Sequence, residues 1–395
     1  MTNRAHRVDC RHFDGYKPCG RDGPCDSACS SFEKVGARIL VVHLEALGAV
    51  LRSTALLPAI KRRFPGSHVT WVTQAPAQAL LEGNPFVDRL LTTTSDDLLI
   101  LSALEFDCAF VVDKSLKAAG VLRATRADLI FGFRAEPGTG AILPATPAAQ
   151  ELWEIGLDDR LKFFENRKAE TQLACEALEL GPWRRDEYVL RLSAPERAAS
   201  AARRARLAPA GEAVIGINTG CSAQIPYKKL TVEAHRELVT RLSRRSGIRV
   251  ALLGGAEDRE RNERIGYGLD VAHTPFDRGL RDGLISVEAC DVVVSGDSLG
   301  LHMAIALRKQ VVAWFGPTCE QEIDLYGRGA KVLTKAPCSP CWKRSCARET
   351  MCYDLVSIED VAAGALRLAM PFAQRKSPPC PSPGPPLPSP PPTSP

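Results

Sequence analysis

A short loop carries four residues of the kinds that bind phosphates and sugars. Asp297, Ser298, Gly300 and His302 follow the apolar run DVVVS and precede the apolar run QVVAWF. Both runs are short, β-branched and unbroken, as in strands buried on both faces, and the roughly ten residues between them suit a helix. Open α/β sheets bind ligands at the carboxyl ends of such strands, beside helix N-termini that favour phosphate. A purely structural alternative is that Asp297 and Ser298 cap the helix expected from Leu299.

The elements that position this loop alternate between strand and helix along the central part of the chain. Residues 36–195 begin with the strand run ARILVVHL, a loop, a helix over 51–64 and the strand run HVTWVTQ. Residues 211–373 start again with AVIGIN and continue with runs such as IRVALL. Strands that alternate with helices through short connections predict a parallel sheet with right-handed crossovers in each region.

We therefore predict an α/β fold of the GT-B architecture, with two Rossmann-like domains that face a central cleft. The strand pattern alone fits a periplasmic-binding-type fold or an epimerase equally well. The expected segments are a Cys-rich stretch 1–35, a first domain 36–195, a linker 196–210, a second domain 211–373 with a Cys-rich loop 338–352, and a disordered proline-rich tail 374–395.

Composition limits the location and the partners. The 395 residues are 45% hydrophobic, which is enough for two domains of ordinary size, and the formal net charge is +5. Because the arginines are scattered over expected helix faces, we expect no nucleic-acid partner. The sequence has no run of about 18 apolar residues, so no membrane-spanning helix is expected. The first residues lack the apolar stretch of a secretion signal, and we expect a cytoplasmic location.

Fourteen cysteines are unusual for a cytoplasmic chain, and many gather near the two ends. The spacing C-x2-C-x4-C-x5-C in the second domain suits four thiolates around zinc or an iron–sulfur cluster. The N-terminal spacing is looser, and His12 is a further ligand candidate there. Disulfides or free thiols are the alternatives to a metal, and a single site shared by the two ends of the chain is a further one. The candidate ligands are Cys10, Cys19, Cys25, Cys29, Cys338, Cys341, Cys346 and Cys352.

Several motifs resemble glycosyltransferase family 9, the ADP-heptose:lipopolysaccharide heptosyltransferases. The resemblance spans about residues 37–370 and includes ILVVHLEALGAVLRSTALLPAIKRRFPGSHVTWVTQ, LLEGNPFVDRLL, INTGCSAQIPYKKLTVEAHRELVTRL, VALLGGAEDRE and GDSLGLHMAIALRKQVVAWFGPT. It implies an inverting transferase that moves a sugar, expected to be heptose, from a nucleotide diphosphate donor to lipopolysaccharide or a related envelope glycan. ADP-heptose and a lipid-linked acceptor are the implied partners, and the resemblance implies no cofactor for the transfer.

The resemblance also assigns residues to the donor. Lys228, or its neighbour Lys229, matches the family lysine that faces the donor phosphates, and a fixed ammonium suits a diphosphate leaving group. Glycines at strand ends let the nucleotide approach the backbone closely. The full set of implied donor residues is Thr219, Gly220, Lys228, Lys229, Gly254, Gly255, Glu257, Asp297, Ser298, Leu299, Gly300 and His302.

The first loop departs from the family pattern. Family members carry an aspartate after the loop glycine as the catalytic base, whereas this chain has Ala49 after Gly48. Alanine cannot accept a proton, so Glu45 is the candidate base, and Arg52 is a candidate anion ligand. His43 is expected to point into the sheet.

Two functions follow from this departure. The first is a transferase whose base has moved, and the second is a catalytically impaired protein that binds sugar nucleotides. A third possibility is a zinc- or iron–sulfur-dependent redox protein. A lipid-linked acceptor would bring the chain to the cytoplasmic face of the inner membrane, assisted by the basic helix that contains Lys61, Arg62 and Arg63.

Overall fold

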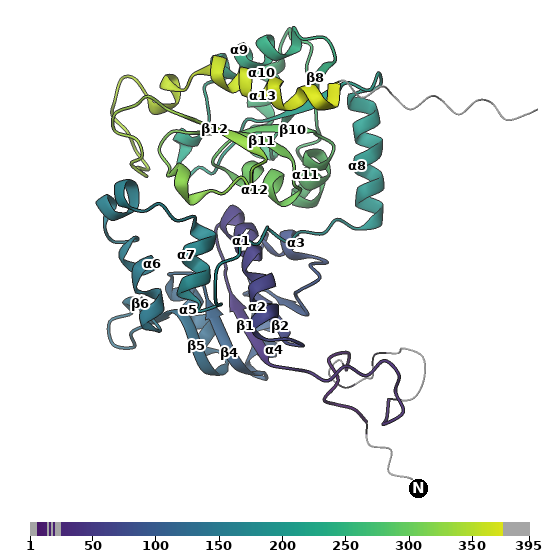
Figure 1. The fold of residues 1–395 in the computed structure, drawn as a ribbon, viewed down its shortest axis with the longest axis vertical. Coiled ribbons are helices and arrows are strands. Elements are labelled where there is room, and N and C mark those ends of the chain that lie inside the picture. The colour runs from purple at the N-terminus through teal and green to yellow at the C-terminus, as the bar shows by residue number, and fades with distance from the viewer. Residues whose placement is uncertain (1–5, 14–15, 17–18, 20–24, 374–395) are drawn as a thin grey trace, which may run out of the picture.

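The chain forms two α/β domains that lie one above the other in the computed structural model (Figure 1). The structure describes residues 6–13, 16, 19 and 25–373. The predicted tail 374–395 and part of the predicted segment 1–35 lie outside these residues. Within the described residues, no helix combines the length and the apolar character needed to cross a bilayer.

The first domain is built on a six-stranded sheet in the order β3-β2-β1-β4-β5-β6. Neighbouring strands are parallel except for β5 and β6. The central strand is buried from Ile39 to Val42, which explains its unbroken apolar sequence. The strands are β1 (Arg38–Val42), β2 (His68–Val72), β3 (Arg89–Leu91), β4 (Glu105–Val111), β5 (Arg126–Ala135) and β6 (Ile142–Pro144).

The helix expected over 51–64 is broken in two. Pro58 has no N–H to continue the helical hydrogen bonds, and a 3₁₀ turn (Thr54–Leu56) separates the two halves at this point. The helices of this domain are α1 (Leu47–Ser53), α2 (Leu57–Arg63), α3 (Gln78–Leu81), α4 (Ser95–Ser102), α5 (Leu116–Arg123), α6 (Gln150–Glu154) and α7 (Glu170–Ala177). A π-helical turn, Leu161–Glu165, lies between α6 and α7.

The second domain repeats the same design. Its sheet has the order β12-β11-β10-β7-β8-β9 with all neighbours parallel, so both sheets have the Rossmann order and reverse direction beside their first strand. The strands are β7 (Ala213–Asn218), β8 (Ile248–Leu253), β9 (Ala272–His273), β10 (Val292–Gly296), β11 (Gln310–Phe315) and β12 (Gly329–Leu333). The helices are α9 (Val232–Ser243), α10 (Arg259–Gly266), α11 (Gly279–Glu288), α12 (Leu299–Ala306) and α13 (Ile358–Ala373).

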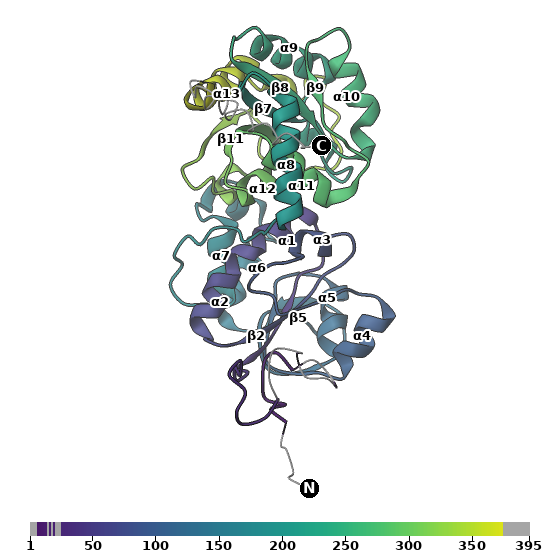
Figure 2. The ribbon, with the colours of Figure 1, turned by 90° about the vertical axis from the view of Figure 1, so that its right-hand side faces the viewer.

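An extended stretch joins the domains, and a helix follows it. Residues 181–192 have no helix or strand, whereas most of the predicted linker 196–210 lies in α8 (Ala194–Leu207). This helix stands along the flank of the second domain beside α11 (Figures 1 and 2), and Arg203 forms an ion pair with Asp282 there at 2.7 Å. The chain therefore crosses between the domains before the segment predicted to be the linker.

The two domains meet through an apolar interface. Leu51 and Ala55 of the first domain belong to the same buried cluster as Leu301 and Ala304 of α12. Figure 1 shows α1 directly beneath α12. Burial of apolar surface between them stabilises a closed arrangement, in which the carboxyl ends of the two sheets face each other.

Candidate functional site

The β10–α12 loop lies at the switch point of the second sheet, next to β7. Asp297 and Ser298 are both more than nine-tenths buried there. Ser298 occupies the N-cap position of α12, yet its side chain makes no capping hydrogen bond. Its hydroxyl instead accepts a hydrogen bond from Asn218 Nδ2 at 2.9 Å. The capping alternative is therefore wrong for Ser298, because its side chain does not cap the first turn of α12.

Asp297 lies between two basic side chains. Its carboxylate is 3.7 Å from Lys228 Nζ and 3.8 Å from His302 Nε2. Burial favours a high pKa for Asp297, but nearby positive charge holds the pKa below its ordinary value. Burial, with the charge of Arg52, lowers the pKa of His302 to about 3, so this imidazole is neutral. Lys228 is therefore the charge that keeps Asp297 ionised.

His302 also contacts the first domain. Tyr188 stacks near its ring, and the phenol oxygen lies 3.2 Å from His302 Nδ1. On the other side Gly48 packs so closely that a Cβ atom there would lie 2.5 Å from His302 Cδ2. This contact requires a glycine in the first turn of α1, and Ala49 follows it at the position where the resemblance implies an aspartate.

Other predicted donor residues surround a carboxylate that the sequence reasoning missed. Gly220 and Gly254 pack against Asp258, and a side chain at either position would collide with it. Burial raises the pKa of Asp258. Thr219 is fully buried, and its hydroxyl donates to Asn262 rather than toward the open face. The sequence offered no local signal for Asp258, because the two glycines meet it only in the folded domain.

The remaining predicted donor residues lie around these contacts. Gly255 donates its N–H to Asp258, and Glu257 is exposed beside it. Gly300 packs against the Asn218 side chain, which a Cβ atom would strike at 2.5 Å. Leu299 is half-buried at the start of α12, and Lys229 makes no ion pair with any described residue. The structure thus brings together Lys228, Asp297, Ser298 and His302, and places Glu257 and Lys229 outside that group.

The candidate base Glu45 lies in an exposed position. Its side chain is 52% exposed and pairs with Lys117 at 2.7 Å. His43 is buried as predicted, and its Nε2 lies 3.5 Å from Asp113, which accepts a hydrogen bond from the Leu44 N–H. Burial raises the pKa of Asp113 and lowers that of His43. This buried pair holds the first loop, while Glu45 points toward solvent.

A second charged group lies at the domain junction. Glu322, in the 3₁₀ turn Glu320–Glu322 after β11, is 8% exposed and lies 3.8 Å from Lys162 Nζ of the first domain. Arg52 pairs with Glu170 at 2.5 Å, with its own side chain 12% exposed. Burial lowers the pKa of Arg52, but the negative charges of Glu170, Glu322 and Asp297 raise it above its ordinary value. These acidic side chains therefore all interact electrostatically with Arg52. The sequence analysis identified Arg52 but not Glu322. The sequence feature that could have indicated Glu322 is its position in the loop after the core strand β11.

The predicted Cys-rich loop reaches the same junction. Trp342 lies 4.0 Å from Lys162 Nζ and donates from Nε1 to the Cys319 sulfur. Burial raises the pKa of Cys352 to about 11, and neighbouring thiolates add to this, so these sulfurs lie near one another. Even so, no three His, Cys, Asp or Glu residues of the described part of the chain are arranged to hold a metal.

The two cysteine sets lie far apart. The N-terminal segment extends from the base of the first domain, and the Cys-rich loop projects from the second domain (Figure 1). The idea that the two ends share one metal site is therefore wrong, because the length of the first domain separates them. Among the described residues all cysteines are free, including the N-terminal Cys10, Cys19, Cys25 and Cys29.

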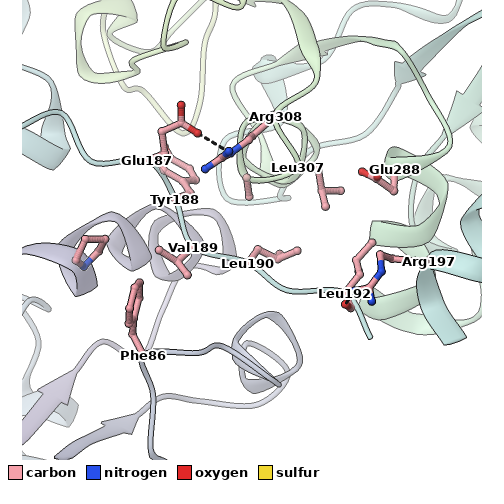
Figure 3. A pocket seen from close by; sticks show the side chains of 12 residues that line it. Phe86, Glu187, Tyr188, Val189, Leu190, Leu192, Arg197, Glu288, Leu307 and Arg308 are labelled. Carbon is pink, nitrogen blue, oxygen red and sulfur yellow. Dashed lines mark hydrogen bonds and ion pairs between the residues drawn. The ribbon is translucent and has the colours of Figure 1, made fainter. Parts of the chain in front are cut away.

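A cavity of about 550 Å³ lies along the extended stretch between the domains (Figure 3). Tyr188, Val189 and Leu190 line it, together with Phe86 of the first domain. Arg308 at its edge pairs with a glutamate of the same stretch. None of the predicted donor residues lines this cavity, so it is distinct from the β10–α12 loop.

The family profile for glycosyltransferase family 9 (heptosyltransferase) matches residues 100–352, which is more than half of the chain. The chain belongs to this family. Lipopolysaccharide heptosyltransferase 1 of Pseudomonas aeruginosa is 35% identical over 116 residues, which cover 28% of this chain and 32% of that protein. The alignment thus spans about a third of the curated relative.

Solved structures show the same fold over most of this family 9 chain. The family 9 glycosyltransferase of Veillonella parvula has a TM-score of 0.69 at 18% identity, and covers 85% of this chain and 98% of its own. ADP-heptose lipopolysaccharide heptosyltransferase II of Escherichia coli has a TM-score of 0.59 at 18% identity, with coverage of 84% and 99%. The iron-containing dodecameric glycosyltransferase TibC of enterotoxigenic E. coli has a TM-score of 0.52 at 14% identity, with coverage of 86% and 77%. These likenesses establish the GT-B fold.

Proposed function

We propose that this chain is an inverting glycosyltransferase that moves a heptose from ADP-heptose to lipopolysaccharide or a related envelope glycan. The observation that carries the proposal is the buried Lys228–Asp297 pair at the switch point of a family 9 domain. The partial match to a lipopolysaccharide heptosyltransferase supports the sugar and the acceptor class. The donor is proposed from the same family membership.

The proposed chemistry places positive charge where the leaving diphosphate gains negative charge. The Lys228 ammonium and the N-terminus of α12, which has no side-chain cap, would face the diphosphate. Asp297, held ionised by Lys228, would accept hydrogen bonds from ribose hydroxyls. The acceptor hydroxyl would attack the anomeric carbon from the opposite face, which lies toward the first domain.

The proposed acceptor is lipid-linked, so the enzyme would work at the cytoplasmic face of the inner membrane. The basic helix α2 gives this contact little support. Lys61 pairs with Asp88 at 3.0 Å, and Arg62 pairs with Asp186 at 2.5 Å. Because these charges are already neutralised within the chain, the proposed membrane contact rests on the acceptor.

Donor turnover tests the proposal. Purified protein with ADP-heptose and a deep-rough lipopolysaccharide extract should release ADP and label the extract with heptose. Omission of the extract should reduce ADP release to a slow hydrolysis. UDP-glucose, assayed in parallel, should give little release of UDP if ADP-heptose is the correct donor.

A second candidate function rests on Ala49, which stands where the family carries its base. A catalytically impaired protein would bind ADP-heptose in calorimetry without turnover under any acceptor. That result would overturn the transferase proposal. Turnover that requires the extract would instead exclude the impaired protein.

We also propose a structural metal, zinc or iron, in the Cys-rich loop. The proposal rests on the electrostatic coupling among the four thiols and on the likeness to TibC, which is an iron-containing glycosyltransferase. Their arrangement in this structure does not itself form a coordination set. The candidate ligands are Cys338, Cys341, Cys346 and Cys352.

Elemental analysis decides this proposal. We expect about one zinc or iron per chain, and we expect the Cys338→Ser/Cys341→Ser variant to lose it and to melt at a lower temperature. The Cys175→Ser variant is a matched control, because Cys175 is buried in the first domain, away from the loop. Equal metal content in both variants would contradict the assignment.

A further inference from the structure

Glu322 is an acidic group that the proposed donor chemistry does not use. It is more than nine-tenths buried at the junction of the two domains. Its carboxylate accepts no hydrogen bond from any described residue, and the nearest cation is Lys162 Nζ at 3.8 Å. A buried carboxylate normally has hydrogen-bond donors around it, so this one has the capacity to accept a proton from a bound molecule.

The other carboxylates around the two loops have charged or backbone partners. Asp297 is paired with Lys228, and Glu170 with Arg52 at 2.5 Å. Glu45 is exposed and paired with Lys117, and Asp113 holds the backbone of the first loop. Among the described acidic residues around the two loops, Asp297 and Glu322 are both buried with their nearest cation beyond hydrogen-bond distance. Their surroundings differ, because positive charge holds the pKa of Asp297 low, whereas the pKa of Glu322 is raised.

The surroundings of Glu322 make it basic near neutral pH. Burial, and then the negative charge of Glu170, raise its pKa to about 7, while Lys162 and Arg52 act in the opposite direction. The negative charge of Asp297 in the donor loop adds to the rise. A general base is most effective when its pKa lies near the working pH.

We propose that Glu322 is the general base of the transfer, in place of the aspartate that Ala49 replaces. This inference rests on the proposed function. The Glu322 carboxylate takes the proton of the acceptor hydroxyl as that oxygen forms a bond to the anomeric carbon. The bond from that carbon to the diphosphate breaks, and its electron pair leaves with ADP. Glu322 is then protonated and returns its proton to solvent after the products leave.

Kinetics of matched variants test the assignment with ADP-heptose and the deep-rough lipopolysaccharide extract. Glu322→Gln should lower kcat/KM by about 10²- to 10⁴-fold, while the Kd for ADP changes less than about threefold. Glu320→Gln is the control, because Glu320 lies two residues away and pairs with Lys331 at 2.7 Å; its kcat/KM should stay unchanged. Near-normal turnover in Glu322→Gln, with loss in Asp113→Asn or Glu45→Gln, would overturn the assignment.

The pH profile separates a base from a structural role. The wild type should lose kcat/KM as the pH falls below about 7, because Glu322 becomes protonated. Glu170→Gln removes a negative charge that raises the Glu322 pKa, so the acid limb should move to lower pH. An acid limb that does not move in Glu170→Gln would contradict the role. If the wild type shows no turnover at all, the proposed function fails, and this assignment fails with it.

Discussion

Replacement of Lys228 by glutamine should lower kcat/KM for donor turnover by about 10²- to 10³-fold. The ammonium lies 3.7 Å from Asp297 and is mostly buried, with 15% of its side chain exposed. Charge that is fixed before reaction stabilises a leaving diphosphate far better than solvated charge does. The variant should also bind ADP more weakly, because the ground-state diphosphate already carries negative charge.

Lys229→Gln provides the matched control for this experiment. Lys229 is the next residue and makes no ion pair with any described residue, so its loss should change kcat/KM by less than about threefold. Thermal melting of both variants should exclude unfolding as the cause. A larger loss in Lys229→Gln than in Lys228→Gln would show that Lys229 is the lysine that faces the phosphates.

The second large effect is expected at Gly48. A Cβ atom there would lie 2.5 Å from the His302 ring, closer than real side chains approach. The ring cannot easily yield, because it is buried and Tyr188 contacts Nδ1. Gly48→Ala should therefore hold the two domains apart and lower kcat/KM by up to about 10²-fold, since a displacement of an ångström can cost that much.

Binding and control measurements make the Gly48 prediction specific. The Kd for ADP should change less than kcat/KM in Gly48→Ala, because the proposed nucleotide site lies in the second domain and meets Gly48 only at His302. Gly120→Ala is the control: Gly120 lies in α5 with open space around its Cα, so a methyl group there should be neutral or slightly stabilising. Small-angle scattering should show a more open shape for Gly48→Ala alone, and an unchanged shape with full activity would contradict the closure argument.

Local sequence patterns predicted the fold class of two α/β domains. The unbroken runs of β10 and β11 specify strands buried on both faces, and the alternation with helices specifies parallel sheets. Ser193 and Glu196 form a capping box, with Pro195 in the first turn, so a local sequence signal marks the start of α8 just before the predicted linker. The break of the first long helix at Pro58 had an equally local signal.

The candidate site depended on contacts that no local pattern contains. The sequence by itself determined that Asp297 ends a strand, that Lys228 follows another, and that Ala49 cannot act as a base. Only the tertiary structure decided that Lys228 pairs with Asp297, that Gly48 meets His302, and that Glu322 is buried beside Lys162. The physical reason is that hydrophobic periodicity acts within a few residues, whereas burial and charge pairing at the site arise when two separately folded sheets close on each other.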